Sequence, residues 1–236
     1  MMSPGKVSFV FYNKLIRIYC GFKIMTVLRR FVLLLMVSGF VISTLNTELS
    51  AGKYNPVLNV GDQVPGWEKL PATDGTSLSS DTFKDKQVLV IAFICNSCPY
   101  AVDYEDRLNR LAQKYSAKDS QVAVIAVNVN LVPADSMEKM QEQAKKKKFV
   151  FPYLFDASQK IGQKFGATRT PEFFVLNKDR KVVYMGAMDD ATDASKVKRD
   201  YVSLAINAAL KGKQPEITET IAIGCNVRYK RIRRKK

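Results

Sequence analysis

The sequence predicts an α/β fold in which helices cover both faces of a central mixed β-sheet. Continuous apolar, β-branched runs at 87–94 and 122–130 are typical of strands that are buried on both faces. Each run is followed by a stretch whose apolar residues recur at helical spacing. A strand pair and an amphipathic helix close the chain. This alternation is typical of a three-layer α/β/α sandwich.

Local signals place the other elements along the chain. Residues 59–86 are polar and rich in turn formers, and Asp74-Gly75 marks a hairpin tip. Tyrosines and leucines at three- and four-residue steps predict a helix over 96–115. The remaining elements are a helix from Pro133 and Ser136 to the lysine run 145–148, a short strand at 152–155, a helix at 158–166 that Gly166 ends, a hairpin of strands 172–177 and 181–188, and a last helix at 195–210.

The first 51 residues form a predicted signal peptide or presequence. Arg29-Arg30 precedes the apolar stretch FVLLLMVSGFVI, and a polar segment then ends in Ser50-Ala51. A basic region, an apolar core and a small-residue exit are typical of secretory signals. The core is shorter than the ~20 residues that a membrane-spanning helix needs. We therefore expect export to the periplasm or cell envelope, with an uncleaved N-terminal anchor as the alternative and Met25 as a second candidate start.

The basic charge is concentrated at the two ends of the chain. Of the net charge of +15, residues 1–51 carry +5 and the tail RYKRIRRKK, 228–236, carries +7. Residues 52–227, the predicted domain, are left with +3. A nucleic-acid-binding domain would carry basic residues over one face, so we expect no nucleic-acid partner. The tail is expected to be solvated, with weak attachment to an anionic surface as the alternative.

Histidine is absent from the sequence. Its absence excludes Ser-His-Asp catalysis, Cys-His catalysis and histidine-ligated zinc. The candidate functional residues are therefore the cysteines, of which Cys20 lies in the presequence and Cys95, Cys98 and Cys225 lie in the predicted domain. Disulfides form and persist in exported proteins, which makes a cysteine pair that forms one plausible.

The stretch FICNSCPY, residues 93–100, places Cys95 and Cys98 between a buried strand and a helix. Free backbone N–H groups at a helix N-terminus stabilise a thiolate, so Cys95 is expected to have a lowered pKa and to act as the nucleophile. Cys98 lies one turn further on and can resolve a mixed disulfide. Two alternatives stay open: a zinc site, which would need a second pair of ligands, and a structural disulfide, which would close a very small loop.

The order strand, C-x-x-C, helix, strand, helix, and then Thr170-Pro171 before a hairpin resembles the thioredoxin-like superfamily over roughly residues 59–212. The N-terminal section, the insertion 131–150 and GCNVRY at 224–229 are similar to the bacterial redoxin branch related to alkyl hydroperoxide reductases. The resemblance implies the thioredoxin-like three-layer α/β/α sandwich. It also implies that Pro171 is cis and faces the dithiol, and that Thr170 offers its backbone to the substrate.

The resemblance implies a thiol–disulfide oxidoreductase that acts on protein thiols and disulfides through a redox-active Cys95–Cys98 disulfide. No bound cofactor or metal is expected, because the cysteine pair carries the electrons. One alternative is a peroxiredoxin-like thiol peroxidase, although Val88 and Ala92 stand where the motif P-x-x-x-[TS]-x-x-C has its proline and hydroxyl. Another is a Cu(I)-binding module in which Cys225 joins the pair, since soft thiolates suit Cu(I).

Cys225 follows the last predicted helix and has no obvious partner. The apolar residues 221–223 are expected to anchor its segment against the core. Three roles are open for it: a buried small side chain, a third thiol that relays the disulfide, and a link between two chains.

A carboxylate that assists proton transfer is the last candidate feature. Three acidic residues follow the pair on the predicted helix, namely Asp103, Glu105 and Asp106. Most or all of them are expected to be solvated. Glu105 is the candidate assistant.

Overall fold

The computed structural model describes residues 52–230 of the chain. The predicted signal segment, residues 1–51, lies outside the described residues, as do residues 231–236. Within the described part, no helix is both long and apolar enough to cross a membrane.

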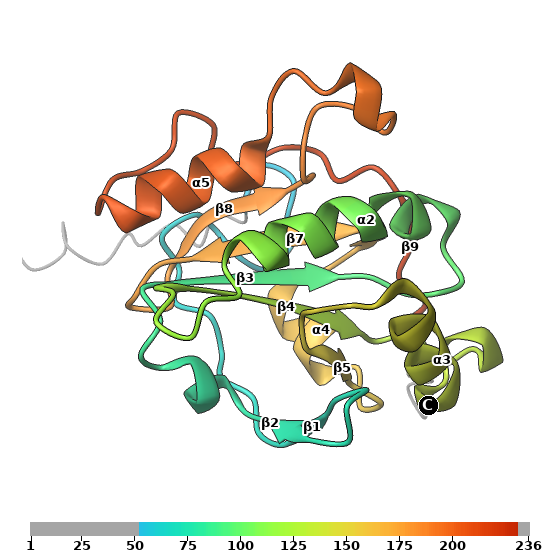
Figure 1. The fold of residues 1–236 in the computed structure, drawn as a ribbon. Coiled ribbons are helices and arrows are strands. Elements are labelled where there is room, and N and C mark those ends of the chain that lie inside the picture. Colours follow the sequence, from blue (N-terminus) through green and yellow to red (C-terminus); the bar gives the residue numbers. More distant parts are fainter. Residues whose placement is uncertain (1–51, 231–236) are drawn as a thin grey trace, which may run out of the picture. The chain divides into compact units, whose positions relative to one another are not determined.

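Five strands form the central sheet, in the order β5-β4-β3-β7-β8 (Figure 1). β3 (Val88–Phe93) lies in the middle, parallel to β4 (Val122–Asn128) and antiparallel to β7 (Glu172–Leu176). β5 (Tyr153–Phe155) pairs in parallel with β4, and β8 (Val182–Gly186) pairs antiparallel with β7. The sheet is therefore mixed, as predicted.

Helices cover both faces of this sheet, which confirms the predicted three layers. The even-numbered residues of β3 pack into one apolar cluster with α2 (Pro99–Lys114), α5 (Tyr201–Leu210) and a buried methionine of α3 (Met137–Lys147). Its odd-numbered residues pack into a second cluster with α4 (Lys160–Phe165) and Trp67. Figure 1 shows α2 and α5 side by side over the first face. Both faces of β3 are apolar because both are covered.

Short elements connect the layers. They are β1 (Leu70–Pro71), β2 (Ser77–Leu78), η1 (Ser80–Phe83), η2 (Pro133–Asp135), β6 (Arg169–Thr170), η3 (Ala194–Lys196) and β9 (Cys225–Asn226). β1 and β2 pair antiparallel around the predicted hairpin tip. Gly75 adopts the left-handed φ of 87° there, which glycine allows at little cost.

Two helices begin later than their periodicity predicts. α2 begins at Pro99, whose fixed φ suits the first helical position, and Cys98 becomes the N-cap. α5 begins at Tyr201 because the side chain of Asp200 accepts the backbone N–H of Ser203 and caps the helix. In both cases one residue with a strong terminal preference sets the boundary.

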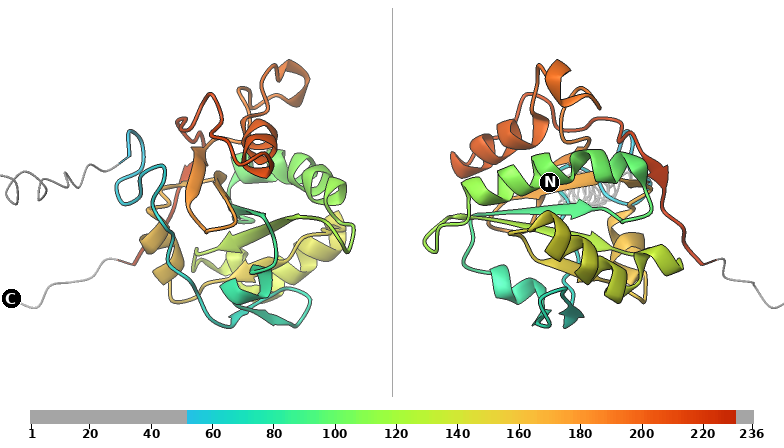
Figure 2. Two further views of the ribbon diagram at one scale, coloured as in Figure 1. Left: turned by 90° about the vertical axis from the view of Figure 1, so that its left-hand side faces the viewer. Right: turned by 45° about the vertical axis from the view of Figure 1, so that its right-hand side comes forward.

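The C-terminal segment returns along the edge of the sheet to the cysteine pair. Met185 of β8 donates its N–H to Thr218 O and accepts the N–H of Thr220, both at 3.1 Å. β9 then pairs antiparallel with β6, and Figures 1 and 2 show it beside the N-terminal end of α2. The expected anchoring by residues 221–223 is wrong, since Ile221 is 62% and Ile223 55% exposed. The segment is held instead by the residues on either side.

Residues 228–230 are held against the body. Arg228 N–H donates to Asn130 Oδ1 at 3.0 Å, and Lys230 N–H donates to Gln159 Oε1 at 2.9 Å. The hydroxyl of Tyr229 donates to the carbonyl of Ala167 at 2.7 Å. Their backbone is therefore fixed, while Arg228 and Lys230 are exposed to solvent as expected, and the rest of the tail lies outside the described residues.

Candidate active site

Cys95 and Cys98 lie in the turn that joins β3 to α2. β3 is paired on both sides over its whole length, so the turn starts from the most constrained strand of the sheet. Both cysteines are free thiols, and their side chains are buried, at 3% and 1% exposure. Because the pair is buried, it is shielded from water, and a reactant can reach it only past the segments that cover it.

Thr170 and Pro171 lie against the pair, and the peptide bond between them is cis, as predicted. Cys98 Sγ lies 3.0 Å from the carbonyl oxygen of Thr170, to which its thiol donates, and Cys95 Sγ lies 3.5 Å from the Thr170 hydroxyl. The buried carboxylate of Glu172 accepts the backbone N–H groups of Thr168 and Arg169 at 2.8 and 2.9 Å. Glu172 thus fixes the turn that brings Thr170 to both sulfurs.

The two thiols ionise in separate steps. The pKa of Cys98 is lowered to about 4, first by the hydrogen bond from the Cys95 thiol and then by the Cys225 thiol, the Thr170 side chain and the N–H of Ala101. Together these donors lower the pKa of Cys98 by more than two opposing effects raise it. The opposing effects are burial and the loss, on ionisation, of the hydrogen bond that the Cys98 thiol donates to the Thr170 carbonyl. The pKa of Cys95 is raised, because it donates that bond to Cys98, is buried and lies near the charge of Asp135. The interaction between the two thiols therefore lowers the pKa of Cys98 and raises that of Cys95, so the pair loses its two protons in two separate steps.

This distribution reverses the expectation that Cys95 has the lowered pKa. Because α2 begins after Cys98, the free N–H groups of its first turn reach the sulfur of Cys98 rather than that of Cys95. The positive end of the helix favours negative charge at that sulfur. The expectation failed because it placed the start of the helix at residue 96.

Asp135 is a site residue that the sequence did not reveal. Its fully buried carboxylate accepts the N–H of Ser97 at 2.8 Å and the Ser97 hydroxyl at 2.7 Å, which fixes the turn between the two cysteines. Its charge also raises the pKa of Cys95. Asp135 lies in η2, inside the insertion 131–150, and nothing in its local sequence distinguishes it from a solvated aspartate.

Glu105, the predicted proton-transfer assistant, has a different role. It is buried instead of solvated, and it accepts from Gln143 Nε2 at 2.8 Å and pairs with Lys147 Nζ at 3.4 Å. These contacts join α2 to α3. Glu105 is not among the main groups that shift the pKa of either cysteine. The expectation of solvation holds for Asp103 and Asp106, which are exposed.

Cys225, the candidate third thiol, lies beside Cys98. The register of β9 on β6 places it directly opposite Thr170. Its half-buried thiol shares a hydrogen bond with Cys98 and accepts the N–H of Tyr100. The structure therefore brings together all of the predicted site residues, Cys95, Cys98, Thr170, Pro171 and Cys225.

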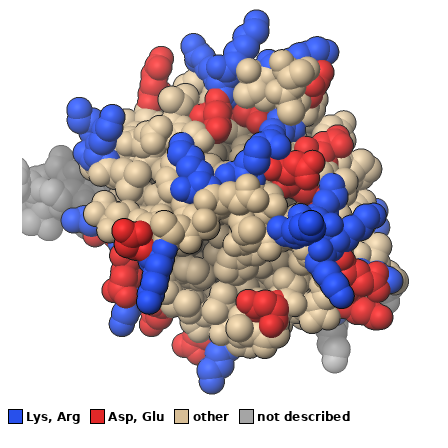
Figure 3. Space-filling view, in the orientation of Figure 1, with Lys and Arg blue, Asp and Glu red and all other residues tan. Residues whose placement is uncertain are grey.

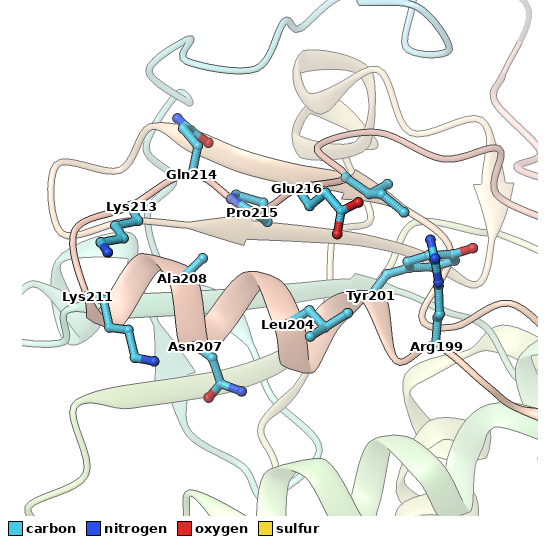
Figure 4. Close-up of a pocket in the computed structure, with 11 residues that line it drawn as sticks. Arg199, Tyr201, Leu204, Asn207, Ala208, Lys211, Lys213, Gln214, Pro215 and Glu216 are labelled. Carbon is cyan, nitrogen blue, oxygen red and sulfur yellow. The ribbon is translucent and has the colours of Figure 1, made fainter.

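A separate groove of about 410 Å³ lies between α5 and residues 213–217 (Figure 4). Tyr201 and Lys211 are among the residues that line it, and none of the cysteines does. Within residues 52–230, no three Cys, Asp or Glu side chains are grouped as metal ligands, so the Cu(I) alternative gains no support.

Comparison with known proteins agrees with this geometry. The model of the Redoxin family matches residues 59–201. The structure of a hypothetical protein from Sinorhizobium meliloti 1021 is 32% identical with a TM-score of 0.67, and the match covers 75% of this chain and 97% of that chain. An uncharacterized conserved protein from Geobacillus kaustophilus is 31% identical with a TM-score of 0.68, over 75% of this chain and 95% of that chain. No curated protein matches the sequence.

Because the family model spans more than half of the sequence, the chain belongs to the Redoxin family of the thioredoxin-like superfamily and is a thiol redox protein.

Proposed function

We propose that the chain is a thiol–disulfide oxidoreductase that exchanges disulfides with protein substrates through Cys95 and Cys98. One observation carries the proposal. Thr170 contacts the sulfurs of both cysteines, at 3.5 Å from Cys95 and 3.0 Å from Cys98, and the interaction between the two thiols raises the pKa of Cys95 and lowers that of Cys98, so that they can share one proton. A dithiol in this state can form a thiolate at either sulfur without releasing a proton to water.

The shared proton lets Cys95 begin the reaction. When the proton moves to Cys98, the thiolate left on Cys95 attacks one sulfur of the substrate disulfide and expels the other as a thiolate. Cys98 then loses its proton and attacks the Cys95 sulfur of the mixed disulfide. The Cys95–Cys98 bond forms, and the second substrate thiolate leaves. The substrate gains the two electrons that the protein dithiol loses.

Thr170 and Pro171 position the substrate in this proposal. Thr170 meets Cys95 through its hydroxyl and Cys98 through its carbonyl, so a peptide bound along Arg169–Thr170 lies beside the reacting sulfurs. Extended peptides commonly bind by pairing with the edge of a strand, and here a substrate peptide would take the place that β9 holds on β6.

Two buried apolar residues of β3 favour disulfides over peroxides as substrates. Val88 and Ala92 stand where peroxiredoxins carry a proline and a hydroxyl residue, and both are fully buried in the cluster under α2. An apolar side chain at the second position offers a peroxide no hydrogen bond.

Insulin reduction by the full chain, with dithiothreitol as the electron source, tests the proposal. Cys95→Ser should abolish catalysis, because the thiol that attacks the substrate disulfide in this mechanism is gone. Cys98→Ser should accumulate mixed disulfides, which non-reducing gels and mass spectrometry detect. Ala117→Ser, on the exposed turn after α2, is the matched control and should react like the wild type. Equal rates for the wild type and Cys95→Ser, with equal melting temperatures, would refute the proposal.

A further inference from the structure

The first turn of α2 directs its free N–H groups at two sulfurs. The N–H of Ala101 reaches Cys98, and the N–H of Tyr100 reaches Cys225. These groups have no partner within the helix, so they are available to bind and stabilise negative charge. Cys225 pairs opposite Thr170, whose carbonyl oxygen lies 3.0 Å from the sulfur of Cys98, so Cys225 and Cys98 are neighbours. Cys98 is also the first cause of the raised pKa of Cys225 in the reduced site.

Backbone contacts hold Cys225 at that position. β9 pairs with β6 so that Cys225 faces Thr170, and Val227 N–H donates to Thr168 O at 3.0 Å. The residue before it must be glycine, because a Cβ atom on Gly224 would overlap the carbonyl oxygen of Thr170. Any extended segment that pairs with β6 in this register brings one residue against Cys98. In this chain that residue is a cysteine.

We propose that Cys225 is a third redox-active cysteine, which takes over the disulfide by bonding to Cys98. The proposal rests on the proposed function of Cys95 and Cys98, because the Cys95–Cys98 disulfide is its starting state. In this proposal β9 occupies the position beside Thr170 that a substrate strand would take, although β9 is part of the same chain.

The proposed step is an exchange in which no electrons leave the protein. Cys225 loses its proton, and its thiolate attacks the sulfur of Cys98 in the Cys95–Cys98 disulfide. The bond between Cys95 and Cys98 breaks as the bond between Cys98 and Cys225 forms. Cys95 leaves as a thiolate and takes up a proton or attacks a further disulfide. The oxidised protein then holds its disulfide between Cys98 and Cys225, with Cys95 free.

Oxidation of the pair favours this attack. In the reduced site the pKa of Cys225 is raised, first by its hydrogen bond to Cys98 and by burial, and then by the negative charge of Cys98. A disulfide carries no such charge. The charge of Arg228 and the N–H of Tyr100, which lower the pKa of Cys225, stay in place. Cys225 is thus a stronger acid in the state in which a disulfide is present for it to attack.

Disulfide mapping of the full chain tests the proposal. The Cys95→Ser protein is treated with diamide, its free thiols are alkylated in acid, and its peptides are analysed by mass spectrometry. We expect a disulfide between Cys98 and Cys225, because the two thiols are neighbours. Cys98→Ser, treated in the same way, should give about tenfold less of the link between Cys95 and Cys225, because Cys225 is held beside Cys98. In the oxidised wild type, both Cys95–Cys98 and Cys98–Cys225 should appear.

Gly224→Ala tests the position of β9 without removing a sulfur. Combined with Cys95→Ser, it should lower the yield of the Cys98–Cys225 disulfide by about tenfold or more. The added methyl group would displace β9 from Thr170 and so move Cys225 away from Cys98. Gly212→Ala is the matched control. Its Cβ atom meets open space, and although its positive φ of 66° adds backbone strain that Gly224 does not have, nothing at β9 is displaced, so the yield should not change.

The outcomes separate the two proposals. If Cys98 and Cys225 both stay reduced in oxidised Cys95→Ser while the wild type forms Cys95–Cys98 and reduces insulin, the third-cysteine proposal is wrong and the proposed function stands. An unchanged Cys98–Cys225 yield in the Gly224→Ala background would also overturn the role given to β9. If the wild type forms no Cys95–Cys98 disulfide and does not reduce insulin, both proposals fall.

Discussion

Cys98 receives hydrogen bonds from two other cysteines and from a helix end, and this concentration of donors sets the chemistry of the site. A thiolate buried without donors would be costly, so each donor adds directly to its stability. Asp135 acts in the opposite direction on Cys95, whose pKa it helps to raise. The two sulfurs are therefore chemically different, although they stand three residues apart in one turn.

The ultraviolet absorbance of the thiolate should report this difference. In the reduced protein, the thiolate of Cys98 should persist as the pH falls from 8 to about 5 and disappear as the pH passes about 4, since a lowered pKa keeps the thiol ionised above that value. The measurement is absorbance near 240 nm, taken as the difference between the wild type and Cys98→Ser so that other thiols cancel.

Cys225→Ala is the control for this titration and should raise the midpoint without abolishing the step, because it removes one of several donors. If the absorbance difference is lost by pH 7, as for a thiol with an ordinary pKa of about 8.5, the assignment of the thiolate to Cys98 is wrong.

At the scale of single residues, the sequence predicts which residues form the site better than it predicts what each of them does there. The C-x-x-C spacing and the Thr170-Pro171 dipeptide identify side chains that do meet, because their patterns are local. The location of the charge depends on where α2 begins. The part played by Asp135 depends on a contact across 38 residues, which no local pattern encodes.

Arg107 fastens α2 to the loop that follows β8. Its guanidinium donates to Asp189 Oδ2 at 2.7 Å and to the carbonyls of Ala191 and Thr192 at 2.9 and 2.7 Å. It also stacks on the ring of Tyr104, 3.6 Å from the centroid. Arg107 and Asp189 are both buried, at 8% and 4% side-chain exposure. These contacts fix the helix whose first turn holds the cysteine sulfurs.

Arg107→Met should destabilise the protein by about 3–5 kcal/mol, because it leaves the charge of Asp189 buried without a partner. Urea unfolding followed by tryptophan fluorescence measures the loss. The double variant Arg107→Met, Asp189→Leu should recover much of it, since both charges are then gone. A single variant within about 1 kcal/mol of the wild type would show that the pair does not hold α2.

At the scale of elements, the buried strands are predicted well, but β6 and β9 are not predicted at all. The apolar runs at 87–94 and 122–130 fall within one or two residues of β3 and β4 because burial on both faces leaves a strong local pattern. β6 and β9 have two residues each and lie far apart in the sequence. Segments of that length show no periodicity, so their pairing is a product of the tertiary fold alone.

In the whole molecule, the densest positive charge stands at the C-terminal end of the sequence. On the face drawn in Figure 3, basic and acidic side chains are interspersed, in keeping with the net charge of +3 on residues 52–227. Five further basic residues stand at 231–236, directly after Lys230, whose backbone N–H donates to Gln159. Attachment of this end to an anionic surface stays a prediction.

Replacing those five basic residues with glutamine should weaken binding to phosphatidylglycerol vesicles at low salt, by about 1 kcal/mol for each charge that lies near the surface. Insulin reduction should not change, because residues 228–230 and β9 keep their contacts. Vesicle sedimentation measures the binding. The matched control replaces Lys145, Lys146 and Lys148 at the exposed end of α3. Equal binding by the tail variant and the wild type would show that the tail does not attach the protein to an anionic surface.

The return of the C-terminal segment to the cysteine pair has a consequence for newly made chains. Cys95 and Cys98 leave the ribosome about 75 residues before Thr170 and about 130 residues before Cys225, so β9 cannot cover them until the chain is almost complete. If the chain enters an oxidising compartment with its N-terminus first, the close pair therefore meets the oxidant before Cys225 does. The first disulfide is then expected between Cys95 and Cys98. The proposed bond to Cys225 would follow by exchange once β9 is in place, so the direction of synthesis would favour one order of disulfide formation.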